Sequence, residues 1–522
     1  MTEVLILAAG SIKHKFNCFK LSFNSPALLP INTRNVVSYI IDFYIGNNIK
    51  VNLAINEEDT DEINQELVYY LNKINIIKLK DSKNVIETIY KSLNMIKNED
   101  IIINLVTSIP TELVNKDTCF ISDKIFKTKE YSLIFNDRFF YKNDKVINEG
   151  YAFTGIFRTN KNLILNAIEK IGFKDDLMYI VEFLKDKLNF KHTVWIDVGH
   201  EANYHLAKNL LISSRSFNRI KIFEIKGELI KVSEDNEKLN DEIKFISMLP
   251  DELKIYFPRV LEQSTNYVKM EYYGYPTLAE YMLYWDISDV YWEKIFYVLE
   301  KILKEFNNYK YSIGYYAYYN FYYKKYEKRI KQFKRQLSRY NFLFNDYLII
   351  NDRKYKNLNL LNNKIALQIE KLYNEENFCI MHGDLCFNNI LYDINSNIIR
   401  LIDARGSFGD GCKGIYGDIK YDLAKITHSV IGQYDYIVNN IFKLEINNNA
   451  INYFIPKRKN YEFLKALNLN LIKNMGFNWK DIMFIVGLLF VSMTPLHDDN
   501  LDRQIVMYAH GVKILNEVLE ED

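Results

Sequence analysis

The first 208 or so residues alternate short apolar runs, which are typical of buried strands, with segments whose apolar side chains recur at helical spacing. Such alternation predicts a parallel sheet with helices on both faces. The expected strands are residues 4–8, 50–55 and 101–105, and the expected helices are residues 35–45 and 86–97.

The pattern changes near residue 213. Two strand-like segments there surround Lys226 and Gly227, a pair typical of a hairpin turn, and the helix that follows stops before Pro250. The remainder is mostly helical, apart from a strand–loop–strand unit at residues 378–404. The expected elements after the change are strands at residues 217–225, 228–233 and 268–272 and a helix at residues 237–248.

The chain has 522 residues, which is too many for one hydrophobic core, and a prior of about 150 residues per domain suggests about three folding units. We expect a first domain at residues 1–208, a small lobe at residues 209–275 and a helical large lobe at residues 276–522. The fold class is therefore α/β.

Charge is balanced, with 67 basic and 66 acidic residues, so the composition shows no footprint for nucleic acid. Apolar runs are short and interrupted, and we expect no integral membrane segment. The run at residues 4–8 has no basic leader before it, which favours a buried strand over a signal peptide. The five cysteines include no CxxC pair, which predicts free thiols in a reducing cytoplasm, without disulfides or a zinc site.

Candidate chemistry is concentrated at residues 381–391 and 401–406. Asp384 lies five residues before Asn389, and Asp403 closes the apolar strand of the second segment. In phosphoryl transfer from ATP, one carboxylate orients the acceptor and accepts its proton, while an amide and a second carboxylate hold magnesium. The order and spacing therefore indicate a phosphotransferase.

These segments, together with Tyr-Asp-Leu-Ala at residues 421–424, resemble the aminoglycoside phosphotransferase and choline kinase family, a branch of the protein-kinase-like fold. Residues 382–391 match its catalytic loop, HGDxxxxNIL, and residues 401–403 match its metal-binding strand end. The resemblance covers the chain after residue 208 and implies a bilobal fold that binds ATP and Mg²⁺. It assigns Asp384 as the catalytic base and Asn389 and Asp403 as magnesium ligands.

The same resemblance implies a strand lysine that pairs with a helix glutamate and contacts the nucleotide phosphates. Lys231 and Glu242 have this spacing, with Glu237 as a rival partner. The alternative for Lys231 is an exposed lysine on an edge strand. Met270 and Tyr272 would belong to the hinge whose backbone reads the adenine.

Other residues near the motif have two interpretations. Arg405 and Lys413 could contact an anion or be solvated surface charges, and the latter is favoured. The aromatic run at residues 315–326 fits core packing better than a cage for a quaternary ammonium group. The remaining expectations are that His382 braces the catalytic loop, His428 packs inside a helix, and Asp422 caps a helix and orients the loop.

Residues 5–10, 27–31, 104–111 and 195–200 resemble segments of the sugar-phosphate nucleotidyltransferase family. The resemblance covers the first domain and implies a Rossmann-like fold of the GT-A type. In that family a glycine-rich turn, a lysine and two aspartates bind a nucleotide and its metal ion.

This first domain departs from the family at several of those groups. Ala27 stands where the family has its lysine, and Thr107 or Ser108 stands where it has one metal aspartate, so that Asp197 alone remains. Nucleotidyl transfer needs magnesium and a cation on the α-phosphate, so we expect the domain to be catalytically inactive. The residues that could replace the lost cations in part are Lys13, Lys15 and Lys20.

Together the two resemblances predict an ATP- and magnesium-dependent small-molecule kinase that acts on a hydroxyl or similar acceptor in bacterial capsule or surface-polysaccharide modification. The alternative is a bifunctional kinase and nucleotidyltransferase that makes a CDP-type activated small molecule. An aminoglycoside resistance enzyme is less favoured, because beyond Asp410 and Asp418 the loop has no acidic cluster for a cationic acceptor. A non-enzymatic scaffold is the fourth interpretation. The expected partners are a nucleotide and an unnamed small-molecule acceptor, and a homo-oligomer is left open.

Overall fold

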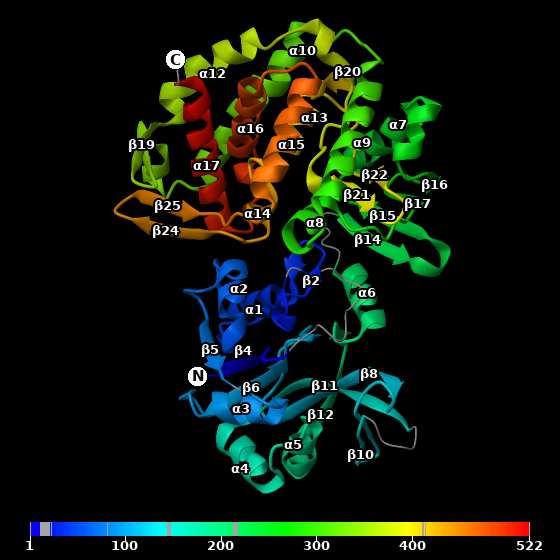
Figure 1. The fold of residues 1–522 in the computed structure, drawn as a ribbon, viewed down its shortest axis with the longest axis vertical. Helices are drawn as coiled ribbons and strands as arrows, with labels where there is room; N and C mark the ends of the chain where they lie inside the picture. The colour runs from blue at the N-terminus through cyan, green and yellow to red at the C-terminus, as the bar shows by residue number, and fades with distance from the viewer. Residues whose placement is uncertain are drawn as a thin grey trace. The chain divides into compact units, whose positions relative to one another are not determined.

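The computed structural model describes residues 2–10, 21, 23–80, 82–142, 148–211, 218–409, 412 and 414–520. The chain divides into two compact units, Met1–Ile212 and Ser213–Asp522 (Figure 1). Residue 208, where the sequence places the end of the first domain, lies inside helix α6 (Glu201–Leu210), and the first unit includes that whole helix.

A nine-stranded sheet forms the centre of the described part of the first unit, with β10-β9-β11-β6-β1-β4-β5 in order and β8 paired with both β11 and β12. Its strands are β1 (Glu3–Leu7), β4 (Lys50–Asn56), β5 (Asn75–Leu79), β6 (Asp100–Leu105), β8 (Thr118–Lys127), β9 (Leu133–Phe135), β10 (Arg138–Phe140), β11 (Glu149–Asn160) and β12 (Asn189–Thr193). Strands β1, β4, β5 and β6 are parallel, which confirms the expected parallel sheet. The antiparallel pairing of β11 with β6, β8 and β9 was not expected.

Helices cover both faces of the parallel strands. Helix α1 (Val36–Gly46) lies on one face, and α3 (Val85–Leu93) and α4 (Lys161–Ile171) lie on the other (Figure 1). All five residues of β1 are buried, so this strand occupies the middle of the core.

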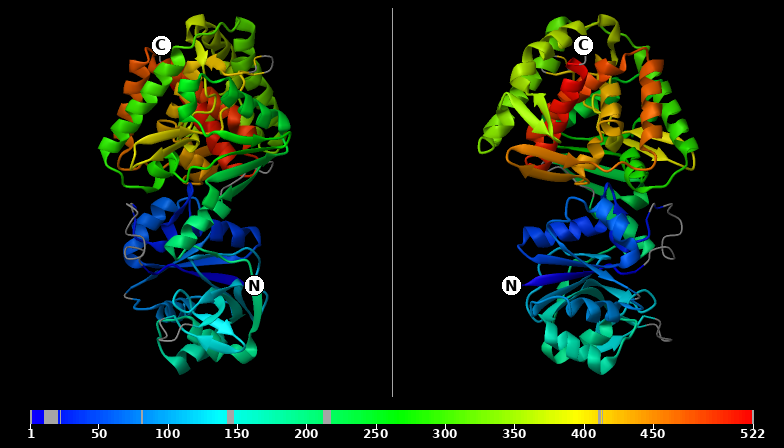
Figure 2. Two further views of the ribbon diagram at one scale, coloured as in Figure 1. Left: turned by 90° about the vertical axis from the view of Figure 1, so that its right-hand side faces the viewer. Right: turned by 60° about the vertical axis from the view of Figure 1, so that its left-hand side comes forward.

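The second unit opens with a four-stranded antiparallel sheet of order β14-β15-β17-β16 (Figure 2). The elements are β14 (Asn218–Phe223), β15 (Glu228–Ser233), α7 (Asn236–Met248), β16 (Val260–Gln263) and β17 (Tyr267–Glu271). The strand expected at residues 217–225 ends earlier, because a 3-10 turn at Glu224–Lys226 and Gly227 at φ 61° reverse the chain. Phe217 lies outside the described residues.

The remainder of the second unit is mostly helical. Its main helices are α8 (Leu278–Tyr284), α9 (Asp289–Asn307), α10 (Tyr315–Tyr319), α11 (Lys325–Gln336), α12 (Leu358–Lys371), α13 (Ile419–Val430), α15 (Tyr461–Asn474), α16 (Trp479–Met493) and α17 (Leu501–Leu519). Two hairpins form a further sheet of order β19-β18-β25-β24, with β18 (Tyr347–Ile350), β19 (Arg353–Lys356), β24 (Lys443–Asn447) and β25 (Ala450–Phe454). The sequence did not predict this sheet.

Short strand pairs flank the expected catalytic loop. Strand β20 (Phe378–Ile380) pairs with β23 (Tyr416–Asp418), and β21 (Ile390–Asp393) pairs with β22 (Ile398–Leu401). The loop runs from β20 to β21 through a 3-10 turn at Phe387–Asn389. It is therefore anchored at both ends by paired backbone.

One helix of the described residues is long and apolar enough to cross a membrane, over Trp479–Leu496. The share of this window buried inside the unit is 67%, and α16 packs against α13 and α17. A buried core helix has the same length and composition as a membrane span, so the packing favours a core helix.

Candidate active site

Asp422 of α13 fixes the backbone of the loop that carries Asp384. The buried Asp422 carboxylate accepts hydrogen bonds from the backbone N–H groups of His382 at 2.7 Å and Gly383 at 2.8 Å. Burial raises the pKa of Asp422 to about 7, although these two N–H groups favour its charged form. Asp422 thus orients the loop as expected, but it does not cap the helix: the N-cap of α13 is Asp418, whose side chain accepts from Lys420.

The loop is braced from within as well. The Asp384 N–H donates to Nδ1 of the buried His382 at 3.2 Å, which agrees with the bracing expected of that histidine. The Asn389 amide N–H donates to the Asp384 carbonyl at 2.8 Å. The donor side of the Asn389 amide is thereby used, and its oxygen is the atom that could ligate a metal.

Lys231 brings the two lobes of the second unit together. Its Nζ lies 2.6 Å from Glu242 Oε2 and 2.6 Å from Asp403 Oδ1. Lys231 belongs to β15, Glu242 to α7, and Asp403 lies two residues after the end of β22. The structure therefore joins three residues that lie up to 172 positions apart in the sequence.

The exposed-edge interpretation of Lys231 is wrong, because β15 pairs with a strand on each side and the lysine is 8% exposed. Burial disfavours its charge, but the attraction of Asp403 and Glu242 is stronger and raises its pKa. Burial raises the pKa of Glu242. Desolvation also opposes the charge of Asp403, yet the Lys231 ammonium prevails and lowers the pKa of that carboxyl.

Met270 lies near the end of β17 and Tyr272 follows that strand, next to Gly227 in the turn before β15. The Met270 side chain packs into the small core of this lobe. The Tyr272 N–H donates to the Gly227 carbonyl at 2.9 Å, and the Glu271 N–H donates to the Arg259 carbonyl at 3.0 Å. These two N–H groups are engaged within the unit, so an adenine contact from this segment would have to come from its carbonyl groups or from the residues that follow.

The sequence reasoning missed Lys425, the cation next to Asp384. Its Nζ lies 2.8 Å from Asp384 Oδ1, and the residue is 6% exposed. Burial opposes its charge, but Asp384 and Tyr421 raise its pKa above the ordinary value. A signal was present in the sequence: Lys425 follows the Tyr-Asp-Leu-Ala motif directly and lies three residues after Asp422, on the same face of α13.

Two further expectations near the loop have different outcomes. Arg405 is half-buried and its Nη1 donates to the Tyr421 hydroxyl at 3.3 Å, so it is wrong to describe it as a solvated surface charge. Lys413 lies outside the described residues. His428 is fully buried and stacks on Tyr434 with 4.3 Å between ring centroids, as expected for a packed histidine.

In the first unit, the two segments that resemble metal-binding positions do meet. Strand β13 (Ile196–Asp197) pairs with β7 (Ser108–Ile109), and Asp197 is the register partner of Ser108. Asp197 Oδ2 accepts from the Tyr131 hydroxyl at 2.7 Å, His200 Nδ1 at 2.8 Å and Asn203 Nδ2 at 3.0 Å, while its Oδ1 accepts from the Gly199 N–H at 2.9 Å. Both oxygens are thus occupied by protein donors, and a metal ion would have to displace them.

Elsewhere in the described residues, the side chains give little support for a metal site made by protein groups alone. Within the residues that the structure describes, no group of three or more His, Cys, Asp or Glu side chains is placed to hold a metal ion. The described cysteines are free thiols, and Cys18 lies outside the described part. The possible replacement cations Lys13, Lys15 and Lys20 also lie outside it.

No protein-family model and no curated protein matches the chain. Solved structures with similarity to its N-terminal part include a Bacillus anthracis protein described as a glucose-1-phosphate thymidylyltransferase, with 13% identity, a TM-score of 0.34 and coverage of 41% of this chain and 97% of that one. Another is the inositol-1-phosphate CTP transferase from T. maritima, with 14% identity, a TM-score of 0.30 and coverage of 41% of this chain and 98% of that one. A third is the CTP:phosphocholine cytidylyltransferase from Streptococcus pneumoniae, with 13% identity, a TM-score of 0.29 and coverage of 40% of this chain and 99% of that one. At these identities and scores the similarity says nothing about the activity of this chain.

Proposed function

We propose that the second unit is a kinase that transfers the γ-phosphoryl group of ATP to a hydroxyl or similar group of a small molecule. The observation that carries the proposal is the Lys231 ammonium, 2.6 Å from both Glu242 and Asp403. A lysine held by a helix carboxylate beside a metal-binding carboxylate is a recurring part of phosphotransferase sites. Asp384 and Asn389 in the braced loop supply the other groups that such a reaction needs.

Each group would have a separate role. Lys231 would contact the α- and β-phosphates of the nucleotide. The oxygens of Asp403 and Asn389 suit Mg²⁺, a hard cation that neutralises charge on the transferring phosphate. The Asp384 carboxylate would accept the acceptor proton as the acceptor oxygen bonds to the γ-phosphorus and the bond to the β-phosphate oxygen breaks, releasing ADP. We place this reaction in the cytoplasm, in the modification of a bacterial capsule or surface polysaccharide.

The direct test is ADP release with ATP, Mg²⁺ and a panel of hydroxylated acceptors, with ATP binding followed by calorimetry. Asp384→Asn should lower kcat by about 10³-fold or more, because the base and its orientation of the acceptor are lost. The matched control is Asp352→Asn, an exposed carboxylate in the β18–β19 turn, which should leave the rate unchanged. Full activity in Asp384→Asn, or neither turnover nor ATP binding in the wild type, would overturn the proposal.

The second candidate is a bifunctional enzyme whose first unit makes a CDP-type product from the phosphorylated molecule. The pairing of Asp197 with Ser108 favours it, since the two strand ends that resemble metal-binding positions are side by side. The donors around both Asp197 oxygens oppose it. Pyrophosphate release from CTP or another nucleoside triphosphate, abolished by Asp197→Ala but not by Asp384→Ala, would establish this second activity.

Aminoglycoside phosphorylation fits the described residues less well. Asp418 is fully buried, lies 3.4 Å from Lys420 Nζ and accepts from the Tyr322 hydroxyl at 3.1 Å. It is therefore a structural carboxylate and cannot serve a cationic acceptor, while Asp410 lies outside the described residues.

A further inference from the structure

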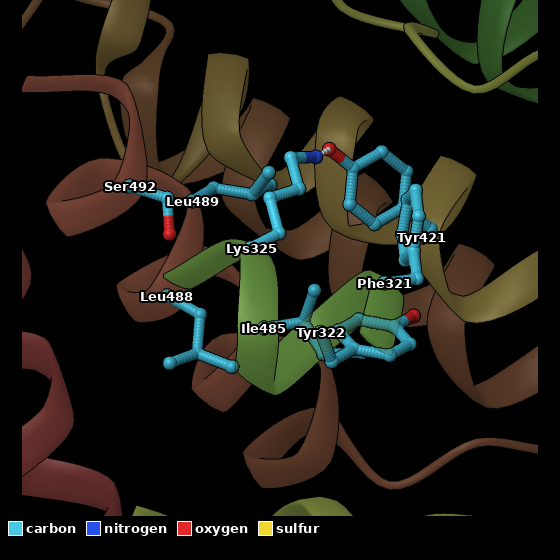
Figure 3. A pocket seen from close by; sticks show the side chains of 8 residues that line it. All are labelled: Phe321, Tyr322, Lys325, Tyr421, Ile485, Leu488, Leu489 and Ser492. Atoms are coloured by element: carbon cyan, nitrogen blue, oxygen red, sulfur yellow. Dashed lines mark hydrogen bonds between the residues drawn. The ribbon is translucent and has the colours of Figure 1, made fainter. Parts of the chain in front are cut away.

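Cations converge on the side chain of Tyr421, beside Asp384. Lys325 Nζ lies 3.4 Å from the Tyr421 hydroxyl, and both side chains line the pocket drawn in Figure 3. Arg405 Nη1 donates to the same hydroxyl at 3.3 Å, and Lys425 acts electrostatically on Tyr421 as well. Three cations from three different segments thus act on one phenol, and one of them, Lys425, also contacts the proposed base.

Among the described residues, carboxylates balance the positive charge of this cluster only in part. Of the described residues, Asp384 pairs with Lys425 and also attracts Arg405 at longer range, but no carboxylate lies within ion-pair distance of Lys325 or Arg405. Arg329, one turn along α11 from Lys325, adds a further cation that interacts with Arg405. Lys325, Arg329 and Arg405 are half-buried, so part of each side chain can be reached by a ligand.

The electrostatic state of the cluster favours the binding of an anion. Burial and the nearby Arg405 lower the pKa of Lys325 to about 8. Burial works against ionisation of Tyr421, yet Lys325, Arg405 and Lys425 together lower the pKa of its phenol to about 7. A bound anion would relieve the repulsion between these cations.

The aromatic rings here are already covered by the protein's own cations. Lys325 Nζ lies 4.5 Å from the Phe321 ring centroid and 5.4 Å from that of Tyr421, and the Arg405 guanidinium lies 5.5 Å from the Phe321 centroid. The Phe321 ring also stacks on Phe408, with 4.0 Å between centroids. A quaternary ammonium acceptor such as choline would meet cations here rather than open aromatic faces.

We propose that the acceptor of the kinase carries a carboxylate or phosphate group, which binds Lys325 and Arg405 while its hydroxyl faces Asp384. The role of this ligand as a phosphate acceptor rests on the proposed function, but anion binding at Lys325 and Arg405 can be measured without turnover. The choice between a carboxylate and a phosphate ester is left to the acceptor panel.

The binding test uses inorganic phosphate and glycerate as probes on the full chain, in the presence of saturating ADP and Mg²⁺. Lys325→Gln should weaken binding by about 10-fold or more, since a hydrogen bond to a charged group contributes about 1.5 to 3 kcal/mol. Lys325→Arg should retain binding, and Lys324→Gln, the exposed neighbour that pairs with Glu327, is the matched control that should bind as the wild type does. Equal binding by Lys325→Gln and wild type, or binding of neither probe by the wild type, would overturn the anion site.

The turnover test compares glycerol with glycerate and glycerol 3-phosphate, and ethanolamine with serine. Within each set, a compound that carries a carboxylate or phosphate should be a better substrate than the one that carries neither, and Lys325→Gln should raise its KM about 10-fold while kcat changes little. Faster turnover of the compounds without a carboxylate or phosphate, glycerol and ethanolamine, would refute the anionic acceptor and leave the kinase standing. Lys325-dependent binding of phosphate, with neither turnover of any compound nor binding of ATP, would have the opposite meaning, because the anion site would stand while the kinase proposal fails.

Discussion

Asp384 and Lys425 form an ion pair whose two halves differ in burial: the aspartate side chain is 33% exposed, whereas the lysine side chain is 7% exposed. Asp384→Ala leaves a buried ammonium without its carboxylate. We expect it to lower the free energy of unfolding by about 2 kcal/mol, less than the 3 to 5 kcal/mol of a fully buried pair because solvent screens the exposed aspartate. Urea denaturation of the purified variant measures this loss.

The double variant provides the control for this expectation. Lys425→Met removes the charge at similar volume, so Asp384→Ala combined with Lys425→Met should recover most of the stability that Asp384→Ala alone loses. A double variant no more stable than Asp384→Ala would show that Lys425 is not held by Asp384. A separate activity assay distinguishes catalysis from stability, because neither Asp384→Ala nor Lys425→Met alone should retain the wild-type kcat.

Asp435 makes the stability of the second unit depend on pH. It is fully buried, accepts from the Asn388 amide at 2.7 Å, and burial raises its pKa to about 7. Between its ordinary pKa and pH 7 the folded protein keeps this proton while the unfolded chain has released it, so stability falls as pH rises through that range. Between pH 5 and pH 8 the free energy of unfolding of the wild type should therefore fall by roughly 2 to 3 kcal/mol more than that of Asp435→Asn. The variant should gain on the wild type by this amount at pH 8, whatever the difference between them at pH 5.

Urea midpoints at both pH values test the Asp435 prediction. Asp422, whose pKa is also raised to about 7 by burial, remains in the variant and should preserve part of the dependence. A wild type and variant whose midpoints shift in parallel with pH would contradict the prediction.

At the scale of residues, the parts of the site that follow a local motif could be predicted and the others could not. Asp384 and Asn389 belong to one loop, and Lys231 and Glu242 belong to a hairpin and the helix after it, so sequence spacing was informative. Lys425 follows the Tyr-Asp-Leu-Ala motif directly, which was a usable signal, but its contact with Asp384 depends on the packing of α13 against the loop, and spacing alone does not identify that partner.

The elements show the same division. Parallel strands with buried residues were predicted because their apolar runs are continuous, and the β14–β15 hairpin was predicted from the turn at Gly227, whereas the β18–β19 and β24–β25 hairpins were missed. The β24–β25 turn has Asn448 and Asn449 at φ 49° and 65°, and the β18–β19 turn has Asn351 and Asp352 at φ 46° and 62°. Asn and Asp tolerate this left-handed backbone, so the Asn-rich turns were a usable hairpin signal. The signal was easy to overlook because asparagine is common throughout the chain.

Helix α16 depends on a glycine at its contact with α17. A Cβ at Gly487 would lie 2.8 Å from Leu515 Cγ and 3.3 Å from Ile514 Cγ2, so the two helices approach too closely for a larger residue. We expect Gly487→Val to lower the free energy of unfolding by about 2 to 3 kcal/mol through overpacking. The matched control is Gly314→Val, at a position where a Cβ meets nothing within 4 Å, and it should cost about 1 kcal/mol or less.

Urea denaturation of both glycine variants distinguishes the two interpretations of α16. A core helix requires the loss at Gly487, and it also requires that the wild type remain in the supernatant after ultracentrifugation without detergent. A tolerated Gly487→Val together with recovery of the protein in the membrane fraction would instead indicate that Trp479–Leu496 spans a bilayer.

At the scale of the whole molecule, the two units differ in the groups that contact their candidate metal-binding carboxylates, Asp403 and Asp197. In the second unit Asp403 contacts a lysine that nucleotide phosphates could share, whereas in the first unit Asp197 is held by Tyr131, His200 and Asn203. The pKa of Asp197 is lowered even though it is buried, because these donors stabilise its charge. A carboxylate so fully engaged stabilises its own unit and is poorly placed to accept a metal ion.

Asp197→Asn in the full chain should therefore leave ADP release within about 2-fold of the wild type, while Asp384→Asn reduces it by about 10³-fold or more. The Asp197 variant should instead lose stability, by roughly 1 to 3 kcal/mol, because an amide cannot accept from every donor that the carboxylate satisfies. Parallel assays of ADP and pyrophosphate release, with thermal unfolding of each variant, separate these effects. Pyrophosphate release that is present in the wild type and lost in Asp197→Asn at a temperature where the variant is folded would show that the first unit is an enzyme in its own right.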